Sequence, residues 1–503
     1  MIEAEVHSSL RAFMREQNQP SWPHHLTMAR LVARALRLGR PALIQTGSSL
    51  ERYAISYLIP ALMGEWPVIL VAPTPVQQYL LETELPRLQQ WLETKKAVKV
   101  GDRWPHETFQ GLLLTSPESW LSDRIHHQQR FPSHVMTIID QADYLEEWGR
   151  QQLTTHLYPN DWDVLIEYCP QFRDFIRDIR VKLTKAIFQH PPNPYSCCLV
   201  ETVEQEILKQ LFDTIEVSSL SNAFRQFWHC WQTDGQLMWA SIAREKGLFT
   251  LHCGPVEVSS ILSPIWEQQP FVLVGGFLDW KSSATIYRKQ LGLGELTCLK
   301  FTPDRQQEFI KLYIPDSFPL PNTPEFQPAL LKQVSTLIHL VNRIHQPIVL
   351  LVEDIPLKPQ IGATLAAEFG SRVQVEKISG KNENTILISS WGFWRSHQYL
   401  FPTPQLLILA TLPIPSLENP VVAGKVTHYK QSGRDWFRLY LLPTALRELQ
   451  RAIAPIRQSQ GIVALFDSRV NNRSYGKQIL TAIEPFARTN YLDNSWVDSN
   501  YLS

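Results

Sequence analysis

With 503 residues, the chain is long enough for two or three domains that each bury a core. Its 48 basic and 48 acidic residues give a formal net charge of zero, which excludes an overall positive field for nucleic acid and leaves only local patches. No apolar run reaches about 18 residues and no signal-type apolar stretch stands near the start, so we expect a cytoplasmic protein without a membrane span.

Residues 41–62 read as a buried strand, a polar turn and an amphipathic helix. A phosphate-binding loop of the pattern G-x-x-x-x-G-K-[ST] occurs in this order of elements. If Gly47 is the first glycine, three other residues occupy the positions of Gly-Lys-Thr. The nucleotide-binding candidates of this stretch are Gly47, Ser48, Ser49, Arg52, Tyr53 and Ala54.

The three replacements remove separate functions. Arg52 disfavours the left-handed torsions with which a glycine turns its N–H group onto a phosphate. Tyr53 carries no positive charge, whereas a lysine–phosphate contact at ~4 Å and an effective dielectric near 20 contributes ~4 kcal/mol. Ala54 lacks the hydroxyl that would hold Mg²⁺. The stretch by itself is equally compatible with a strand, turn and helix that never bound nucleotide.

Further apolar strand candidates follow near residues 67–74, 111–115 and 135–140, and predicted helices alternate with them. This alternation is typical of a parallel, doubly wound sheet. Residues 151–250 change to helical segments, and 271–280 resume the strand pattern. A proline-rich stretch at 315–326 precedes four more strand candidates. We therefore predict an α/β fold with an N-terminal segment (1–20), a first domain (21–150 and 251–314), a helical insertion (151–250) and a second domain (315–503).

Several motifs, taken together, carry a family resemblance. The first domain contains TIIDQADYLEEW, and the second contains ILISSWGFWRSHQYLFP, LLILATLPIPSLENPV and GRDWFRLYLLPTALRELQRAIAPIRQ in that order. Their order, spacing and aromatic content resemble the DinG/XPD type of superfamily 2 DNA helicase over most of residues 20–490. The resemblance implies two tandem RecA-like domains of the P-loop NTPase fold, ATP-dependent helicase activity, and an insertion in the place of the family's arch domain.

The same resemblance assigns catalytic and nucleotide-binding residues. Asp140 would hold Mg²⁺, but Gln141 replaces the glutamate that deprotonates the attacking water. Asp143 follows in the same motif. In the QxxGRxxR motif, Gln450 and Arg457 remain, while the Gly-Arg pair has been replaced. The catalytic set Asp140, Gln141 and Arg457 is therefore expected to be vestigial.

Other motif residues are expected to contact nucleic acid. The resemblance places Pro73 and Thr74 at the nucleic-acid backbone, and Trp394 with Arg395 form a candidate for stacking on a base. The family usually carries four cysteines for an iron–sulfur cluster between the Pro73–Thr74 segment and the motif that contains Asp140. Residues 75–137 contain no cysteine, so we expect no such cluster.

Three functional hypotheses remain open. The first is a degenerate helicase that binds single-stranded DNA or RNA without turning over ATP. The motif changes argue against the binding of ATP and Mg²⁺ that the family shows. The second is a working ATP-dependent DNA helicase in which Arg52 and Asp143 substitute for the missing lysine and base. The third is a non-catalytic subunit that binds only a protein partner.

Overall fold

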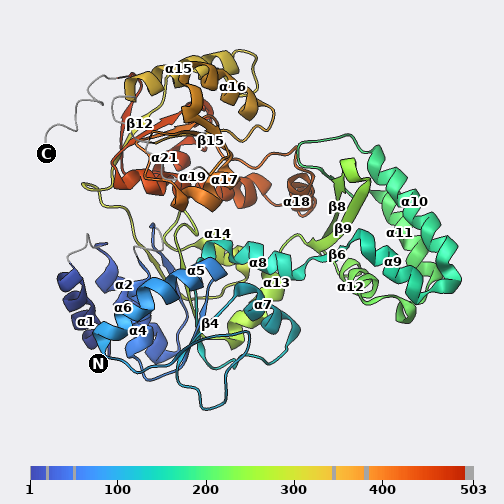
Figure 1. The fold of residues 1–503 in the computed structure, drawn as a ribbon, viewed down its shortest axis with the longest axis horizontal. Helices are drawn as coiled ribbons and strands as arrows, with labels where there is room; N and C mark the ends of the chain where they lie inside the picture. The colour runs from blue at the N-terminus through green and yellow to red at the C-terminus, as the bar shows by residue number, and fades with distance from the viewer. Residues whose placement is uncertain (1, 18–21, 49–52, 342–346, 379–383, 493–503) are drawn as a thin grey trace.

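The computed structural model describes residues 2–17, 22–48, 53–341, 347–378 and 384–492. It contains two parallel sheets of seven strands each and one antiparallel sheet of four strands (Figure 1). This architecture confirms the predicted α/β fold with two RecA-like domains. Within the described ranges, no helix is both long and apolar enough to cross a membrane.

The first sheet has the strand order β11-β1-β10-β5-β2-β4-β3, and all neighbouring strands are parallel. Its central strands are buried along their whole length, as expected when helices cover both faces of a parallel sheet. In spatial order the strands are β11 (Thr297–Lys300), β1 (Ala42–Gln45), β10 (Phe271–Gly275), β5 (Met136–Ile139), β2 (Val68–Val71), β4 (Leu112–Thr115) and β3 (Val98–Val100).

Two separate apolar cores cover the faces of this sheet. One core joins α1 (Ile2–Gln17), α2 (His25–Leu38), α4 (Ile55–Met63), α5 (Thr74–Tyr79) and α6 (Leu85–Leu92) to the strands. The other involves α7 (Pro117–His126), α8 (Leu145–Leu153), α13 (Ser259–Gln268) and α14 (Thr285–Leu291). Because Val6, Leu10 and Phe13 of α1 are buried in the first core, the expected N-terminal segment is part of the first domain.

The second sheet has the order β14-β15-β13-β16-β17-β12-β18 and is also parallel throughout. Its strands are β14 (Val373–Val375), β15 (Ile386–Ser389), β13 (Ile348–Leu351), β16 (Leu406–Leu409), β17 (Ile462–Leu465), β12 (Ile310–Tyr313) and β18 (Phe486–Thr489). The domain boundary predicted at 315 is wrong, because β12 precedes it and pairs with β17 and β18. The proline-rich stretch lies inside the second domain, after its first strand.

Helices also cover both faces of the second sheet. One face carries α15 (Phe326–Val341) and α16 (Leu357–Phe369). The other carries α17 (Trp391–His397), α19 (Leu442–Gln458) and α21 (Gly476–Ala482). In Figure 1, α17, α19 and α18 (Pro420–Gln431) lie on the side of the second domain that faces the first.

The insertion is not purely helical, contrary to the prediction for residues 151–250. Helices α9 (Pro159–Tyr168), α10 (Arg173–Gln189), α11 (Thr202–Thr214) and α12 (Asn222–Trp231) surround an antiparallel sheet with the order β6-β9-β8-β7. The strands are β6 (Thr155–Leu157), β9 (Leu248–Pro255), β8 (Gln236–Ala243) and β7 (Cys197–Leu199). β6 and β7 are three residues long, and β8 alternates in burial, so none resembles the apolar runs of the parallel sheets.

The insertion also contacts the second domain. β7 and β8 pack against α18, as the right-hand side of Figure 1 shows. At this contact a Cβ atom added to Gly424 would lie 2.5 Å from Leu237 Cδ1, so a larger residue there would require the Leu237 side chain to move. The insertion therefore connects the two domains through space as well as interrupting the first along the chain.

Candidate nucleotide and nucleic-acid site

The turn after β1 begins as a phosphate-binding loop would. Gly47 has a φ of 62°, and its N–H donates to the carbonyl oxygen of Gly276 at 3.0 Å. Ser48 is buried, and its hydroxyl has no hydrogen-bond partner among the residues that the structure describes. Ser49 and Arg52 lie outside the described residues. The described part of the turn thus packs against the loop that follows β10.

The carboxylate of Asp140 lies at the end of β5 and is fully buried. Its Oδ1 accepts hydrogen bonds from the Tyr53 hydroxyl at 2.9 Å and from the Gln141 N–H at 2.7 Å. Its Oδ2 accepts from the Tyr57 hydroxyl at 2.7 Å. Burial raises the pKa of Asp140 to about 6, against the opposing effect of these hydrogen bonds. Both carboxylate oxygens are therefore already engaged by protein groups.

Two tyrosines fill the space around this carboxylate. Tyr53 stands at the predicted lysine position and Tyr57 lies one helical turn further on, in α4. Both rings are buried, and desolvation raises the pKa of both phenols well above the usual value, so both hydroxyls remain donors at neutral pH. Ala54 is buried at the N-cap of α4 and offers no hydroxyl. Sequence reasoning missed Tyr57, although its spacing of four residues from Tyr53 places both on one helix face.

Gln141 and Asp143 follow β5 with different geometries. Gln141 has a φ of 52°, a left-handed conformation that few residues other than glycine adopt. Asp143 accepts hydrogen bonds from the N–H groups of Gly276 and Phe277, each at 2.7 Å. Its Oδ1 also accepts from Nη2 of Arg451 in the second domain at 3.3 Å. The Asp143 carboxylate, the candidate for the missing base, therefore already accepts hydrogen bonds from three donors.

Arg451, which the sequence analysis did not single out, belongs to a charged cluster between the domains. Its guanidinium donates to Glu448 at 2.6 Å, and Glu448 also pairs with Arg395 at 3.3 Å. The ring of Tyr144 lies 5.1 Å from the Arg451 guanidinium and 5.9 Å from that of Arg395. Although burial favours its neutral form, the carboxylates of Glu448 and Asp143 raise the pKa of Arg451. The available signal was an arginine directly before the apolar residues Ala452 and Ile453 of α19.

The two retained residues of the QxxGRxxR motif are directed into the second domain, contrary to their predicted nucleotide contact. The Arg457 guanidinium is buried and donates to the carbonyl oxygens of Glu308, Ile483, Glu484 and Pro485. Burial lowers its pKa to about 10. The side-chain amide of Gln450 donates to the Ala482 carbonyl at 2.8 Å. Both side chains therefore hold α19 to the end of α21 and the residues that follow it.

The nucleic-acid candidates separate into buried and exposed residues. Trp394 is 1% exposed and its Nε1 donates to the Ala452 carbonyl at 3.4 Å, so the predicted stacking role is wrong. It lies on helix α17, which turns its indole into the core. Arg395 is paired with Glu448. At the end of β2, Pro73 is half-buried and Thr74 is exposed at the first turn of α5.

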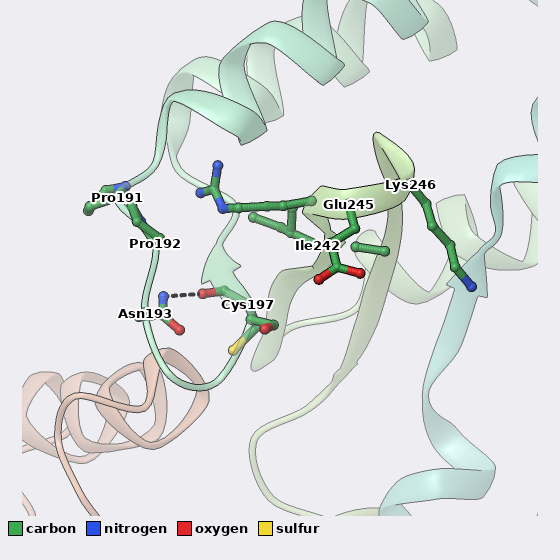
Figure 2. A pocket seen from close by; sticks show the side chains of 10 residues that line it. Pro191, Pro192, Asn193, Cys197, Ile242, Glu245 and Lys246 are labelled. Carbon is green, nitrogen blue, oxygen red and sulfur yellow. Dashed lines mark hydrogen bonds between the residues drawn. The ribbon is translucent and has the colours of Figure 1, made fainter. Parts of the chain in front are cut away.

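A cavity of about 340 Å³ lies elsewhere, within the insertion (Figure 2). Its wall includes Pro191, Cys197, Ile242 and Lys246 at one end of β7 and β8. The side-chain amide of Asn193 donates a hydrogen bond to the backbone carbonyl oxygen of Cys197 at 2.6 Å, drawn as a dashed line in Figure 2. No motif residue lines this cavity, so it is separate from the expected nucleotide site. Within the described residues, no three His, Cys, Asp or Glu side chains gather as metal ligands.

Comparison with known proteins identifies the same architecture. The helicase C-terminal domain family matches residues 348–486. The chain is 26% identical over 109 residues to the ATP-dependent DNA helicase YoaA of Escherichia coli (strain K12), covering 21% of this chain and 17% of that protein. It is 23% identical over 278 residues to the 3'-5' exonuclease DinG of Bacillus subtilis (strain 168), covering 50% of this chain and 29% of that protein.

A solved structure titled "XPD_Helicase" superposes on 92% of this chain and 99% of its own length, with a TM-score of 0.62 and 12% sequence identity. At this identity, the superposition establishes the fold alone. The chain spans less than a third of the length of the curated relatives it matches.

Proposed function

We propose that this chain, a relative of the DinG/XPD-type superfamily 2 helicases, binds single-stranded nucleic acid and has lost ATP hydrolysis. The helicase fold supplies two domains that meet at the carboxyl ends of the first sheet. Nucleic acid would bind to surfaces at this edge of the sheet. ATP hydrolysis, the chemical step that drives a helicase, would be lost.

The observation that carries the proposal is the environment of Asp140. A magnesium ion bound to a nucleotide needs accessible oxygen ligands. Here both oxygens of Asp140 accept hydrogen bonds from buried tyrosines, and Tyr53 stands where the lysine charge would be. The residues present therefore do not fit a Mg–ATP complex, and no catalytic step is assigned to one.

The nucleic-acid part of the proposal is supported by the exposed start of α5, which follows β2. Thr74 presents its hydroxyl at the start of α5, a position suited to a phosphate contact. Since the chain has no net charge, binding has to arise from a few local contacts, and its affinity falls with added salt.

The first experiment measures ATP hydrolysis and ATP binding by the purified chain, with and without single-stranded DNA or RNA. We expect neither activity above background, and no change for Asp140→Asn. DNA-stimulated hydrolysis that Asp140→Asn abolishes would instead establish a working helicase with an unusual site.

The second experiment measures the affinity for a fluorescent oligonucleotide at several salt concentrations. Thr74→Glu places a negative charge at the expected phosphate and should weaken binding by about tenfold, or ~1.4 kcal/mol. Thr336→Glu, at an exposed position of helix α15 at the top of Figure 1, is the matched control and should change little. No binding of DNA or RNA at low salt would favour the protein-binding subunit. The cytoplasmic location stays a prediction.

A further inference from the structure

The two domains meet through a set of side-chain contacts that we call the interdomain joint. It consists of the Asp143–Arg451 ion pair, Trp280 of the first domain, and the Glu257–Arg434 ion pair. Each contact joins a residue before β12 to the second domain. The contacts come from three separate segments of the first domain, so they restrain rotation as well as separation.

The Asp143–Arg451 pair is well shielded from water. The side chains are 7% and 10% exposed, respectively. Asp143 is fixed within its own domain by the N–H groups of Gly276 and Phe277. On the other side, Glu448 fixes Arg451. Both partners are thus held in position before they meet, which reduces the entropy lost on pairing.

Trp280 is presented by a rigid loop. The Gln45 side chain accepts from the Asp279 N–H at 2.9 Å and donates to the Lys281 carbonyl at 3.0 Å. Lys300 Nζ donates to the carbonyls of Asp279 and Trp280 at 2.9 and 2.8 Å. The indole of Trp280 packs against the apolar core of the second domain. An apolar side chain of the first domain, Trp280, therefore packs against the second domain.

The third contact joins Glu257 to the segment that includes and follows α18. Glu257, between β9 and α13, accepts two hydrogen bonds from Arg434, at 2.7 and 2.8 Å. The Tyr429 hydroxyl donates to the same carboxylate at 2.9 Å. The Arg434 guanidinium lies 4.4 Å from the Tyr429 ring. Such a forked pair fixes orientation more strongly than a single contact.

We propose that the interdomain joint holds the two domains closed in the absence of nucleotide, so that the chain is a permanently assembled clamp. In a hinge-closing protein the ligand supplies the free energy that favours the closed state. Here protein side chains supply those contacts, while Tyr53 and Tyr57 surround the carboxylate expected to bind metal. The consequence that nucleic-acid affinity is independent of ATP rests on the proposed function; the closure itself does not.

The test measures the distance between spin labels on the two domains of the full chain. Labels at Arg34→Cys on α2 and Lys332→Cys on α15 occupy exposed positions. The background carries Cys230→Ser and Cys298→Ser, because the remaining described cysteines are buried. We expect one narrow distance distribution that is unchanged by a non-hydrolysable ATP analogue with Mg²⁺. A broad distribution that narrows on adding the analogue would overturn the proposal.

A combined variant, Trp280→Ala with Arg434→Gln and Arg451→Gln, removes both ion pairs of the joint and the Trp280 indole. It should shift the distribution to longer distances and broaden it. The control, Arg177→Gln with Arg438→Gln, removes two positive charges from exposed positions and should leave the distribution unchanged. A folded combined variant that keeps the narrow distribution would also overturn the proposal.

The distance measurement with and without the ATP analogue keeps the residues of the interdomain joint unchanged. It therefore tests the proposed closure even if the combined variant does not fold. The two proposals fail separately. An open chain without ATPase activity contradicts the joint alone, whereas a closed chain that hydrolyses ATP contradicts the proposed function alone.

Discussion

Asp140 and Asp143 stand three residues apart after β5, yet they serve different regions of the molecule. Asp140 is enclosed within the first domain by two tyrosines. Asp143 faces the second domain and pairs with Arg451. One motif thus contributes a buried packing group and an interdomain contact. The comparison teaches that an acidic motif residue can persist for reasons of structure after its expected chemical partners have been replaced.

The largest expected effect distinguishes a buried arginine of α19, Arg457, from an exposed arginine that precedes this helix, Arg438. Arg457→Met removes the donor from four backbone carbonyls and should destabilise the second domain by about 3–5 kcal/mol. Arg438→Met, at an exposed position, should change stability by less than about 0.5 kcal/mol. Urea unfolding measures both. Unchanged stability of Arg457→Met would contradict the structural role of Arg457 and favour its original assignment to the nucleotide site.

Asp140→Asn tests whether the inner carboxylate is an unfavourable buried charge. Because its pKa is raised from 3.8 to about 6, the folded chain binds a proton more tightly than the unfolded chain. The stability from this group is fully present below pH 4 and is lost as pH rises through about 6. An upward change of this size corresponds to about 3 kcal/mol.

Asparagine keeps an acceptor at position 140 and removes the charge. Asp140→Asn should therefore match the parent protein near pH 4 and exceed its free energy of unfolding by about 3 kcal/mol at pH 7.5. Unfolding at both pH values measures the difference. A variant that is less stable than its parent at pH 7.5 would show that the ionised carboxylate is needed, which would break the contrast with Asp143.

Tyr57→Phe should have the smallest of these effects. It removes one hydroxyl donor from Asp140 and should cost about 2 kcal/mol at pH 7.5, where the carboxylate is charged. The cost should decrease toward pH 4, because a protonated carboxyl needs the donor less. Tyr399→Phe, at a position with 67% exposure, is the control. Equal effects of the two variants would argue against a specific Tyr57–Asp140 bond.

Much of the architecture could be predicted because each buried parallel strand is a continuous apolar run. Strands such as β1, β5 and β13 need burial on both faces, and that requirement is visible locally. The insertion sheet escaped prediction because its strands are short or alternating. The buried position of Trp394 also escaped, since a helix rather than a strand carries it.

The sequence by itself determined the two α/β cores, the strand-turn-helix at Gly47 and the loss of the lysine and glutamate from the motifs, because these are properties of neighbouring residues. Only the tertiary structure decided where the remaining polar groups are directed. Tyr53 and Asp140 are 87 positions apart, and Asp143 and Arg451 are 308 apart. Such pairs form only when folding brings distant segments together, and burial then requires each charge or hydroxyl to find a partner.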